Sequence, residues 1–273
     1  MARIETLLLK AGITPARREA LWVIEAVTGM STADVFVPGE VLDEAQDHKV
    51  LELALRRADG EPLQYVTGVA GFRHLELAVG PGVFIPRPET ELLVDRALAR
   101  LPAGGRVADV GTGSGAIALA IAQERPDAVV WATESSTEAL AWAKKNRDAL
   151  SSEVELIECN LLDGLPAELK RALDVAVSNP PYIAWSDRPS LDREVATHEP
   201  SRGLYSGDDG MEVTARLARD ALMWLRPGGW LVLEIGESHG PRAARLLERL
   251  GYEEVSVGHD LNERDRIAEG RAA

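Results

Sequence analysis

Apolar residues recur at helical spacing along the N-terminal part of the chain. The periodic stretches are residues 4–8, 20–27 and 42–58. Thr14 and Pro15 predict the start of the second helix, with the threonine as cap and the proline in the first turn. A further short helix is expected to open at Ser31 or Thr32. This pattern predicts a small N-terminal helical domain over residues 1–61.

The pattern changes between residues 62 and 88. Short runs of strand-forming residues are separated there by glycines and prolines, which predicts a β-hairpin linker. The runs are residues 65–67, 72–79 and 83–85. A helix is expected to begin at Pro88 and to continue through Leu101, because acidic residues fill its first turn, where the helix dipole favours them.

From residue 107 onward, runs typical of strands alternate with runs typical of helices. The predicted strands are 107–110, 128–133, 154–159, 175–178 and 230–235, and the predicted helices are 116–124, 137–150, 211–225 and 241–250. Such alternation builds a parallel sheet with helices on both faces. Residues 254–257 and 266–268 are expected to close the sheet as an antiparallel pair. Ligands of such sheets bind at the carboxyl ends of the strands, near the point where the strand order reverses.

Composition narrows the possible classes of function. Hydrophobic residues make up 45% of the chain and charged residues 27%, so the protein can bury a core and is not disordered. The formal net charge of −14 would repel a phosphate backbone, so no direct nucleic-acid partner is expected. The sequence contains no apolar run near the roughly 20 residues that cross a bilayer, and no membrane partner is expected.

The cysteine and histidine residues indicate neither a disulfide nor a metal site. Cys159 is the single cysteine, which favours a reducing, cytoplasmic compartment, and residues 1–12 lack the features of a signal peptide. Cys159 lies in a strand-like run, where a buried small hydrophobe is expected rather than a nucleophile. The five histidines are scattered without metal-ligand spacing, so we expect no metal.

A glycine-rich loop follows the predicted strand 107–110. Gly111, Gly113 and Ala116 satisfy the G-x-G-x-x-G/A pattern, in which glycines let the backbone approach a nucleotide at a helix N-terminus. Glu134 ends the next strand, where a carboxylate can accept both hydroxyls of a ribose. The two features favour an adenosine cofactor but do not name the chemistry. A ligand-free tight turn and a helix-capping Glu134 are the alternatives.

The chemistry is indicated by the sequence Asn-Pro-Pro-Tyr at residues 179–182, which we call the hook. The prolines remove two N–H donors and restrict the backbone, so acceptors dominate: the Asn179 side-chain oxygen and the Pro180 carbonyl. Tyr182 adds a flat ring. Two rigid acceptors suit a planar –NH₂ group, and they would favour pyramidalisation of its nitrogen as a new bond forms. The alternative is a turn without chemical function.

With these motifs the sequence resembles the HemK/PrmC family, the glutamine methyltransferases of peptide chain release factors. The shared segments are residues 60–68, 83–91, 109–115, 178–182 and 260–267, so the resemblance covers essentially the whole chain. The hook alone is shared with adenine-N6 methyltransferases, whereas Ile-Pro-Arg-Pro-Glu-Thr-Glu at residues 85–91 is more specific. The resemblance implies an α/β fold with a class I methyltransferase (Rossmann-like), seven-stranded, mostly parallel sheet. The methyltransferase domain would span residues 89–273.

The resemblance also implies the reaction and its residues. The donor would be S-adenosyl-L-methionine, and the acceptor the side-chain amide nitrogen (N5) of the glutamine in the Gly-Gly-Gln loop of release factors. Catalytic roles would fall on Asn179, Pro180 and Tyr182. The cofactor would be bound by Asp109, Gly111, Thr112, Gly113, Ser114, Gly115, Glu134, Asn160, Leu161 and Asn179. The substrate would be bound by Asn179, Pro180, Pro181, Tyr182, Arg87 and Glu89. We expect a monomer.

Some positions depart from the family pattern or allow a second interpretation. Glu134 stands where many relatives have aspartate, and Asn160 where relatives commonly have an acidic residue. The segment around Glu89 can simply cap a helix. Residues 185–205 are expected to form a loop or lid, in which Trp185 is either a partner anchor or a core residue. The rival functions are an adenine-N6 nucleic-acid methyltransferase, which the acidic charge disfavours, a non-catalytic binding module and a nicotinamide enzyme.

Overall fold

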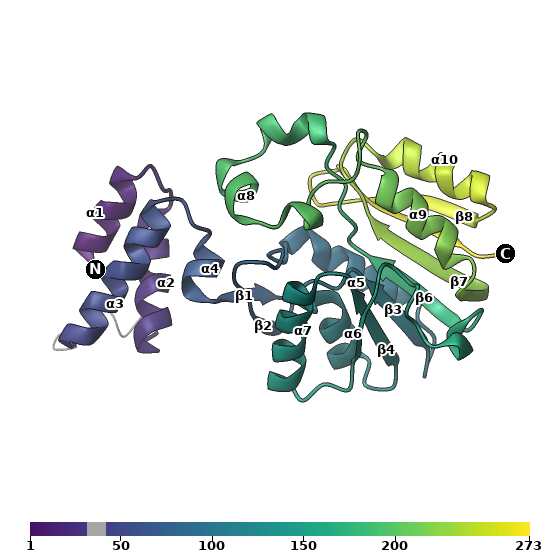
Figure 1. The fold of residues 1–273 in the computed structure, drawn as a ribbon, viewed down its shortest axis with the longest axis horizontal. Coiled ribbons are helices and arrows are strands. Elements are labelled where there is room, and N and C mark those ends of the chain that lie inside the picture. The colour runs from purple at the N-terminus through teal and green to yellow at the C-terminus, as the bar shows by residue number, and fades with distance from the viewer. Residues whose placement is uncertain (32–41) are drawn as a thin grey trace. The chain divides into compact units, whose positions relative to one another are not determined.

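The computed structural model describes residues 1–31 and 42–273, which form two compact units (Figure 1). The first unit contains residues 1–70, 79–81 and 191–199, and the second contains residues 71–78, 82–190 and 200–273. The short helix that the sequence predicts at Ser31 or Thr32 lies outside the described residues. None of the helices within these ranges is long and apolar enough to span a membrane.

The first unit is helical, and its helices before residue 61 agree with the predicted helical N-terminal region, whereas those at residues 63–67 and 193–198 lie in segments predicted as a hairpin linker and a loop or lid. Its helices are α1 (Ala2–Lys10), α2 (Ala16–Thr28), α3 (Glu44–Ala58), α4 (Leu63–Thr67) and α8 (Arg193–His198). Asp43 and Gln46 form a reciprocal capping box that starts α3. The prediction that Thr14 caps α2 is wrong. Pro15 is itself the N-cap residue and makes no side-chain cap bond, so the helix begins one residue later.

The predicted hairpin linker is correct only in part. Strands β1 (Val69–Phe72) and β2 (Leu75–Ala78) pair as a hairpin, but residues 65–67 belong to helix α4 and residues 83–85 join neither sheet. Tyr65 and Val66 are buried, and Val66 packs into the helical core of the first unit. Burial in that core outweighs their intrinsic strand preference, which is weak compared with packing.

A seven-stranded sheet organises the second unit. Its strands are β3 (Arg106–Val110), β4 (Val129–Glu134), β5 (Glu155–Glu158), β6 (Leu173–Ser178), β7 (Leu225–Glu234), β8 (Glu253–His259) and β9 (Asp265–Arg271). The order across the sheet is β5-β4-β3-β6-β7-β9-β8. The first five are parallel and β9 is antiparallel to both neighbours, which confirms the predicted fold class. The strand order reverses between β3 and β6, so a crevice is expected beyond their carboxyl ends.

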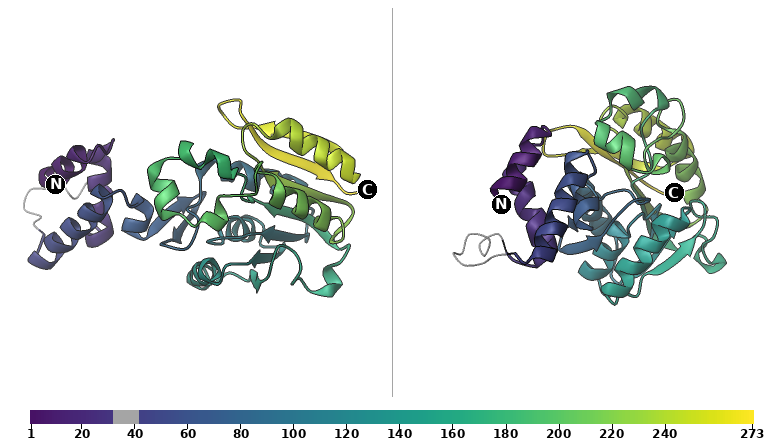
Figure 2. Two further views of the ribbon diagram at one scale, coloured as in Figure 1. Left: turned by 45° about the horizontal axis from the view of Figure 1, so that its top comes forward. Right: turned by 60° about the vertical axis from the view of Figure 1, so that its left-hand side comes forward.

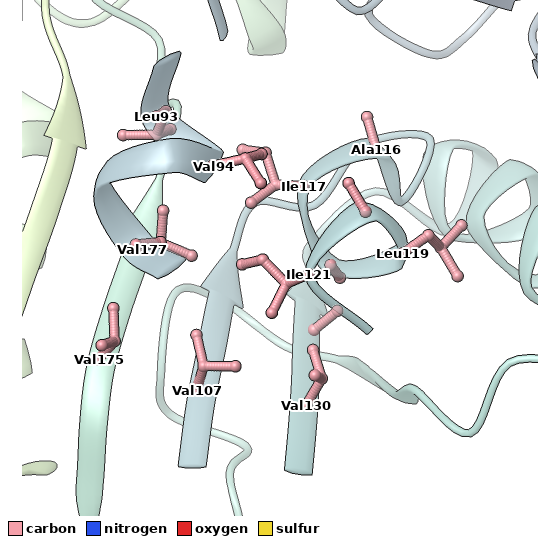
Figure 3. Packing of buried hydrophobic residues seen from close by; sticks show 14 of the residues in the cluster. Leu93, Val94, Val107, Ala116, Ile117, Leu119, Ile121, Val130, Val175 and Val177 are labelled. Carbon is pink, nitrogen blue, oxygen red and sulfur yellow. The ribbon is translucent and has the colours of Figure 1, made fainter. Parts of the chain in front are cut away.

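Helices cover both faces of this sheet. They are α5 (Glu91–Arg100), α6 (Ala116–Glu124), α7 (Thr137–Ala149), α9 (Glu212–Ala221) and α10 (Gly240–Leu250), with short 3₁₀ segments η2 (Pro88–Thr90), η3 (Ala167–Leu169), η4 (Trp185–Ser190) and η5 (Ser201–Gly203). Figure 3 shows Val94 of α5 beside Ile117 of α6, and Ile121 of α6 next to Val107 of β3 and Val130 of β4, all members of one apolar layer. Figure 2 shows α10 lying along the outer strands β8 and β9. Successive strand residues alternate between the two apolar layers, as a pleated strand requires.

The predicted helix 211–225 is too long. Helix α9 ends at Ala221, and Leu225 already pairs with Leu173 of β6. A register shift follows, after which Trp230 pairs with Val175. Strand β7 therefore begins five residues before the predicted strand, because Leu225 gains a backbone partner that the local apolar pattern does not reveal.

Candidate active site at the carboxyl edge of the sheet

A cavity of about 870 Å³ opens at the carboxyl ends of β3, β4, β5 and β6. All of its lining residues belong to the second unit. The predicted site residues on its wall are Gly111, Thr112, Gly113, Ser114, Glu134, Asn160, Leu161, Asn179, Pro180, Pro181 and Tyr182. Segments far apart in sequence meet here because the strands that carry them are neighbours in the sheet.

Four predicted site residues do not line the cavity: Asp109, Gly115, Arg87 and Glu89. The Arg87 guanidinium lies over the Phe84 ring at 4.8 Å, and Phe84 itself lines the cavity. Glu89 is exposed in η2. Arg87 therefore contacts a residue of the cavity wall without lining the cavity itself.

The glycine loop depends on backbone conformations that glycine adopts without strain. Gly111, Gly113 and Gly115 have φ of +74°, +59° and +88°. A Cβ on Gly115 would also lie 2.9 Å from the Leu119 side chain in α6. Gly111 N donates to the Thr133 carbonyl over 2.8 Å, which ties the loop to the end of β4. The loop is therefore held in a fixed shape beside the cavity.

Asp109 supports this loop from within the protein. Its carboxyl group is fully buried and accepts hydrogen bonds from Thr112 Oγ1 at 2.5 Å and from Ala118 N at 3.1 Å. Burial raises the pKa of Asp109 to about 7, against the effect of both bonds. Asp109 thus connects the loop to helix α6.

Asn146, which sequence reasoning missed, braces the loop from helix α7. Its amide nitrogen donates to the Ser114 carbonyl at 2.8 Å and to the Ala78 carbonyl at 3.0 Å, while its oxygen accepts from Ala78 N. The side chain is 2% exposed, so one buried amide joins the loop to strand β2. Nothing in the local sequence distinguishes it from a polar residue on the surface of a helix.

Glu134 faces the cavity from the end of β4. Its Oε2 accepts from Gly113 N at 3.0 Å, and its Oε1 accepts from Ser135 N and Ser136 N, each at 2.8 Å. Three backbone donors therefore fix the position of this carboxylate. Each carboxylate oxygen has two acceptor sites, so Oε2 can still accept a hydroxyl. The arrangement suits a ligand with adjacent hydroxyl groups.

The segment after β5 forms another part of the wall. Cys159, Asn160 and Leu161 all line the cavity, and Leu161 has a φ of +53°. The expectation that Cys159 is a buried core residue is therefore wrong. It is half-buried at the cavity wall, because β5 ends at Glu158, and burial raises the pKa of its thiol.

The hook follows β6 directly. Ser178 Oγ donates to the Val110 carbonyl over 2.6 Å, which ties the end of β6 to the end of β3. Asn179 Nδ2 donates to Thr90 Oγ1 over 3.1 Å, and Asn179 Oδ1 is then the acceptor left for a ligand. Tyr182 lines the cavity with its hydroxyl 3.5 Å from Glu234 Oε1, and burial raises the pKa of that hydroxyl.

The segment 185–205, predicted as a loop or lid, contains the short helical segments η4, α8 and η5. Residues 200–204 line the cavity, and Arg202 reaches the Ser135 carbonyl at 3.4 Å. Trp185 stacks on Tyr205 with ring centroids 4.3 Å apart. Half of Trp185 is exposed, so it is not a core residue. Within the described ranges, no cluster of three or more histidine, cysteine or acidic side chains could hold a metal ion.

Comparison with known proteins agrees with this geometry. The methyltransferase small domain matches residues 76–195, and the PrmC N-terminal domain matches residues 1–68. A methyltransferase structure from Pyrococcus furiosus superposes with a TM-score of 0.56 at 18% identity, covering 84% of this chain and 98% of that one. Fold, glycine loop and domain match together define a class I methyltransferase.

Relatives over most of the chain identify the family. A release factor glutamine methyltransferase of Streptomyces coelicolor is 39% identical over 271 residues, or 97% of this chain and 94% of the relative. One of Gloeobacter violaceus is 44% identical over 233 residues, or 84% of this chain and 80% of the relative. The chain belongs to the family of release factor glutamine methyltransferases, as its sequence motifs predict.

Proposed function

We propose that this protein transfers a methyl group from S-adenosyl-L-methionine to the side-chain amide nitrogen of the glutamine in the Gly-Gly-Gln loop of peptide chain release factors. The observation that carries the proposal is the position of the Asn179 acceptor, on the wall of the same cavity as the glycine loop. The relatives, which are release factor glutamine methyltransferases, supply the substrate class.

The residues on the cavity wall suit the proposed cofactor. The glycines of the loop have left-handed backbone conformations. The space beside Gly111 is open, because a Cβ built there would have no protein atom within 4 Å. The Glu134 carboxylate is fixed by three backbone donors and would accept ribose hydroxyls. Asn160 and Leu161 would contact the adenine ring, one by hydrogen bonding and the other by apolar contact. When bound, the cofactor supplies an electrophilic sulfonium-linked methyl group.

The chain itself supplies positioning and acceptors. Asn179 Oδ1 and the Pro180 carbonyl would each accept one N–H of the substrate amide, which draws electron density onto nitrogen as it loses amide resonance. This interaction grows in the transition state, so it accelerates the reaction rather than only binding the substrate. Tyr182 and Pro181 would form the apolar wall against the glutamine side chain. Arg87 and Glu89 would also bind the substrate.

The proposal also covers the domain bounds, the oligomeric state and the location of the protein. The helical domain would span residues 1–61, the linker 62–88 and the methyltransferase domain 89–273. We propose a monomer in the cytoplasm that binds release factors without direct contact to nucleic acid. The acidic net charge of −14 and the single cysteine support this.

The test is methyl transfer to a purified release factor. Incubation with isotopically labelled S-adenosyl-L-methionine should leave one methyl group on the peptide that contains the Gly-Gly-Gln loop, as read by mass spectrometry. A release factor with alanine in place of that glutamine is the matched control and should gain none. Label that appears in DNA or RNA but not in the release factor would refute the proposal and favour the adenine-N6 alternative.

Asn179→Ala separates chemistry from cofactor binding. We expect it to lower turnover about 100- to 1,000-fold, the usual effect of removing one preorganised group that stabilises a transition state. The dissociation constant of the cofactor, measured by calorimetry, should change little. Equal losses in cofactor affinity with an unchanged single-turnover rate would contradict the role given to Asn179.

A further inference from the structure

A group of buried polar side chains lies next to the hook. Thr90, in η2, and Glu234, the last residue of β7, are 4% and 1% exposed. Thr90 Oγ1 accepts from Asn179 Nδ2 over 3.1 Å, and the Thr90 hydroxyl interacts electrostatically with the Glu234 carboxyl group, whose buried Oε2 has no hydrogen-bond partner among the described residues. Tyr182 donates its hydroxyl to the same carboxyl group. One buried carboxylate therefore reaches two residues of the hook.

The direction of each bond follows from counting protons. A threonine hydroxyl has one proton to donate, and an ionised carboxylate can only accept. An ionised Glu234 can accept a hydrogen bond from the Thr90 hydroxyl through its unpartnered Oε2, and Thr90 Oγ1 then accepts from an amide N–H. Asn179 then binds Thr90 through Nδ2, which leaves Oδ1 to accept from a ligand. A protonated Glu234 can donate to Thr90 instead, and this orientation of the amide is no longer selected.

Strand β9 holds Glu234 from the other side. Glu234 pairs with Ile267, and the neighbouring Arg266 acts electrostatically on both Glu234 and Tyr182. Arg266 is itself fixed by Asp260, whose Oδ2 accepts from Nη2 at 3.0 Å and from Nε at 3.3 Å. The segment 260–267, which the sequence comparison singled out without a role, therefore supports the carboxylate beside the hook.

We propose that Thr90 and Glu234 are positioning residues for methyl transfer, which hold Asn179 with Oδ1 toward the acceptor nitrogen while Glu234 is ionised. This inference rests on the proposed function, in which Oδ1 accepts an N–H of the substrate amide. A flipped Asn179 would present its own N–H donors to the donors of the substrate, so the flipped form is unproductive.

The pH at which the orientation is lost is set by the surroundings of Glu234. The charged and titratable groups that face it are Arg266 on β9, Glu89 in η2 and Tyr182 in the hook, with Asp260 behind Arg266. Burial raises the pKa of Glu234 to about 7, while Thr90 and Arg266 oppose the rise. Turnover at saturating substrate should therefore fall as the pH drops through about 7.

The test compares Thr90→Val, Thr90→Ser and Glu234→Gln in single-turnover methyl transfer across pH 5.5 to 8.5. Thr90→Val removes the hydroxyl at nearly constant volume and should lower the rate about 10- to 100-fold, in line with the cost of a misplaced reactive geometry. Thr90→Ser keeps the hydroxyl and should restore most of that rate. Glu234→Gln should lower the rate and abolish the acidic fall near pH 7. The cofactor dissociation constant should stay within about threefold throughout.

Thr6→Val and Glu248→Gln, at exposed helix positions, are the matched controls and should behave like the wild type. Equal impairment of Thr90→Val and Thr90→Ser would overturn the proposal, because it would indicate a packing defect. An acidic fall that persists in Glu234→Gln would overturn it as well. If the wild-type protein methylates nucleic acid and not the release factor, the proposed function fails alone, and the same variants are then compared on that acceptor.

A measurement without substrate makes the test independent of activity. The side-chain amide signal of Asn179 in a nitrogen-15 NMR spectrum can be assigned by its absence in Asn179→Ala. In the wild type it should shift as the pH crosses about 7, because Nδ2 reports the hydrogen bond to Thr90. The shift should vanish in Glu234→Gln and in Thr90→Val. A wild-type amide signal whose chemical shift does not change between pH 5.5 and 8.5 would overturn the inference.

Discussion

Replacing Asp109 with asparagine should change how the stability of this protein depends on pH. Asp109 is fully buried beneath the glycine loop, and burial raises the pKa of its carboxyl group from 3.8 to about 7. In the unfolded chain the pKa stays near 3.8. Between these two values the folded protein holds a proton that the unfolded chain has lost, so folding takes up a proton and the free energy of unfolding falls as pH rises.

The size of the effect follows from the shift. The difference between 7 and 3.8 is about 3 pKa units, and each unit corresponds to about 1.4 kcal/mol, so the total is about 4 kcal/mol. The stabilisation is fully present below pH 4 and is lost as pH rises through about 7. Asparagine resembles the protonated acid, and its oxygen can accept the bonds from Thr112 and Ala118. The variant should therefore lack this contribution to the pH dependence.

The assay is urea unfolding of the two proteins from pH 4 to pH 8. The comparison requires that the free energy of unfolding depend on urea concentration with the same slope in both proteins. The free energy of unfolding of Asp109→Asn minus that of the wild type should increase by about 4 kcal/mol over this range. Groups that titrate alike in both proteins cancel in the difference. Asp208→Asn, at an exposed position, is the control and should give a flat difference. Parallel curves for the wild type and Asp109→Asn would refute the reasoning.

Three further substitutions test other parts of the structure. Glu134→Ala should raise the dissociation constant of S-adenosyl-L-methionine by about 10- to 100-fold, because it removes the carboxyl acceptor proposed for the ribose hydroxyls. Calorimetry that showed an unchanged affinity would exclude the ribose role. Arg57→Met should destabilise the first unit by about 3–5 kcal/mol. It leaves the Glu19 carboxyl group buried without Arg57, whose Nε lies 2.6 Å from it and whose Nη1 also binds Glu194. The loss is measured by hydrogen exchange in α3, and unchanged protection would contradict it. Gly115→Ala should cost about 1–2 kcal/mol because of its φ of +88°, and unfolding at the wild-type urea midpoint would contradict that cost.

The central strands β3, β4 and β6 could be predicted from the sequence because they are buried on both faces. Such strands are continuous apolar runs, and the structure has them within a few residues of the expected bounds. Errors arose where a distant partner decides the local structure. Val66 has a strand-forming side chain but packs in the helical core, and Leu225 extends a helical pattern but pairs with Leu173. Neither contact leaves a signal within a short window of sequence.

The residues of the site also fall into those that a local sequence pattern reveals and those that only a distant contact reveals. The glycine loop, Glu134 and the hook each have a local signature, because the chemistry requires particular residues in adjacent positions. Thr90 and Glu234 have none, although Thr90 lies within a segment shared with the family. Glu234 comes near the hook through the pairing of β6 with β7, in which Ser178 lies opposite Leu233, the neighbour of Glu234, whereas Thr90 reaches Asn179 from η2. A polar residue at the end of an apolar strand can be a surface residue equally well, so sequence alone does not identify this one as buried.

The geometry of the site is determined mainly by the sheet rather than by its loops. The glycine loop and the hook begin on β3 and β6, which are adjacent parallel strands about 4.8 Å apart. The bond from Ser178 Oγ to the Val110 carbonyl joins these strands at the last residue of each. The spacing between the loop and the hook therefore follows from backbone pairing and one buried hydroxyl. A reaction that needs donor and acceptor aligned within a fraction of an ångström is best supported by elements of this rigidity.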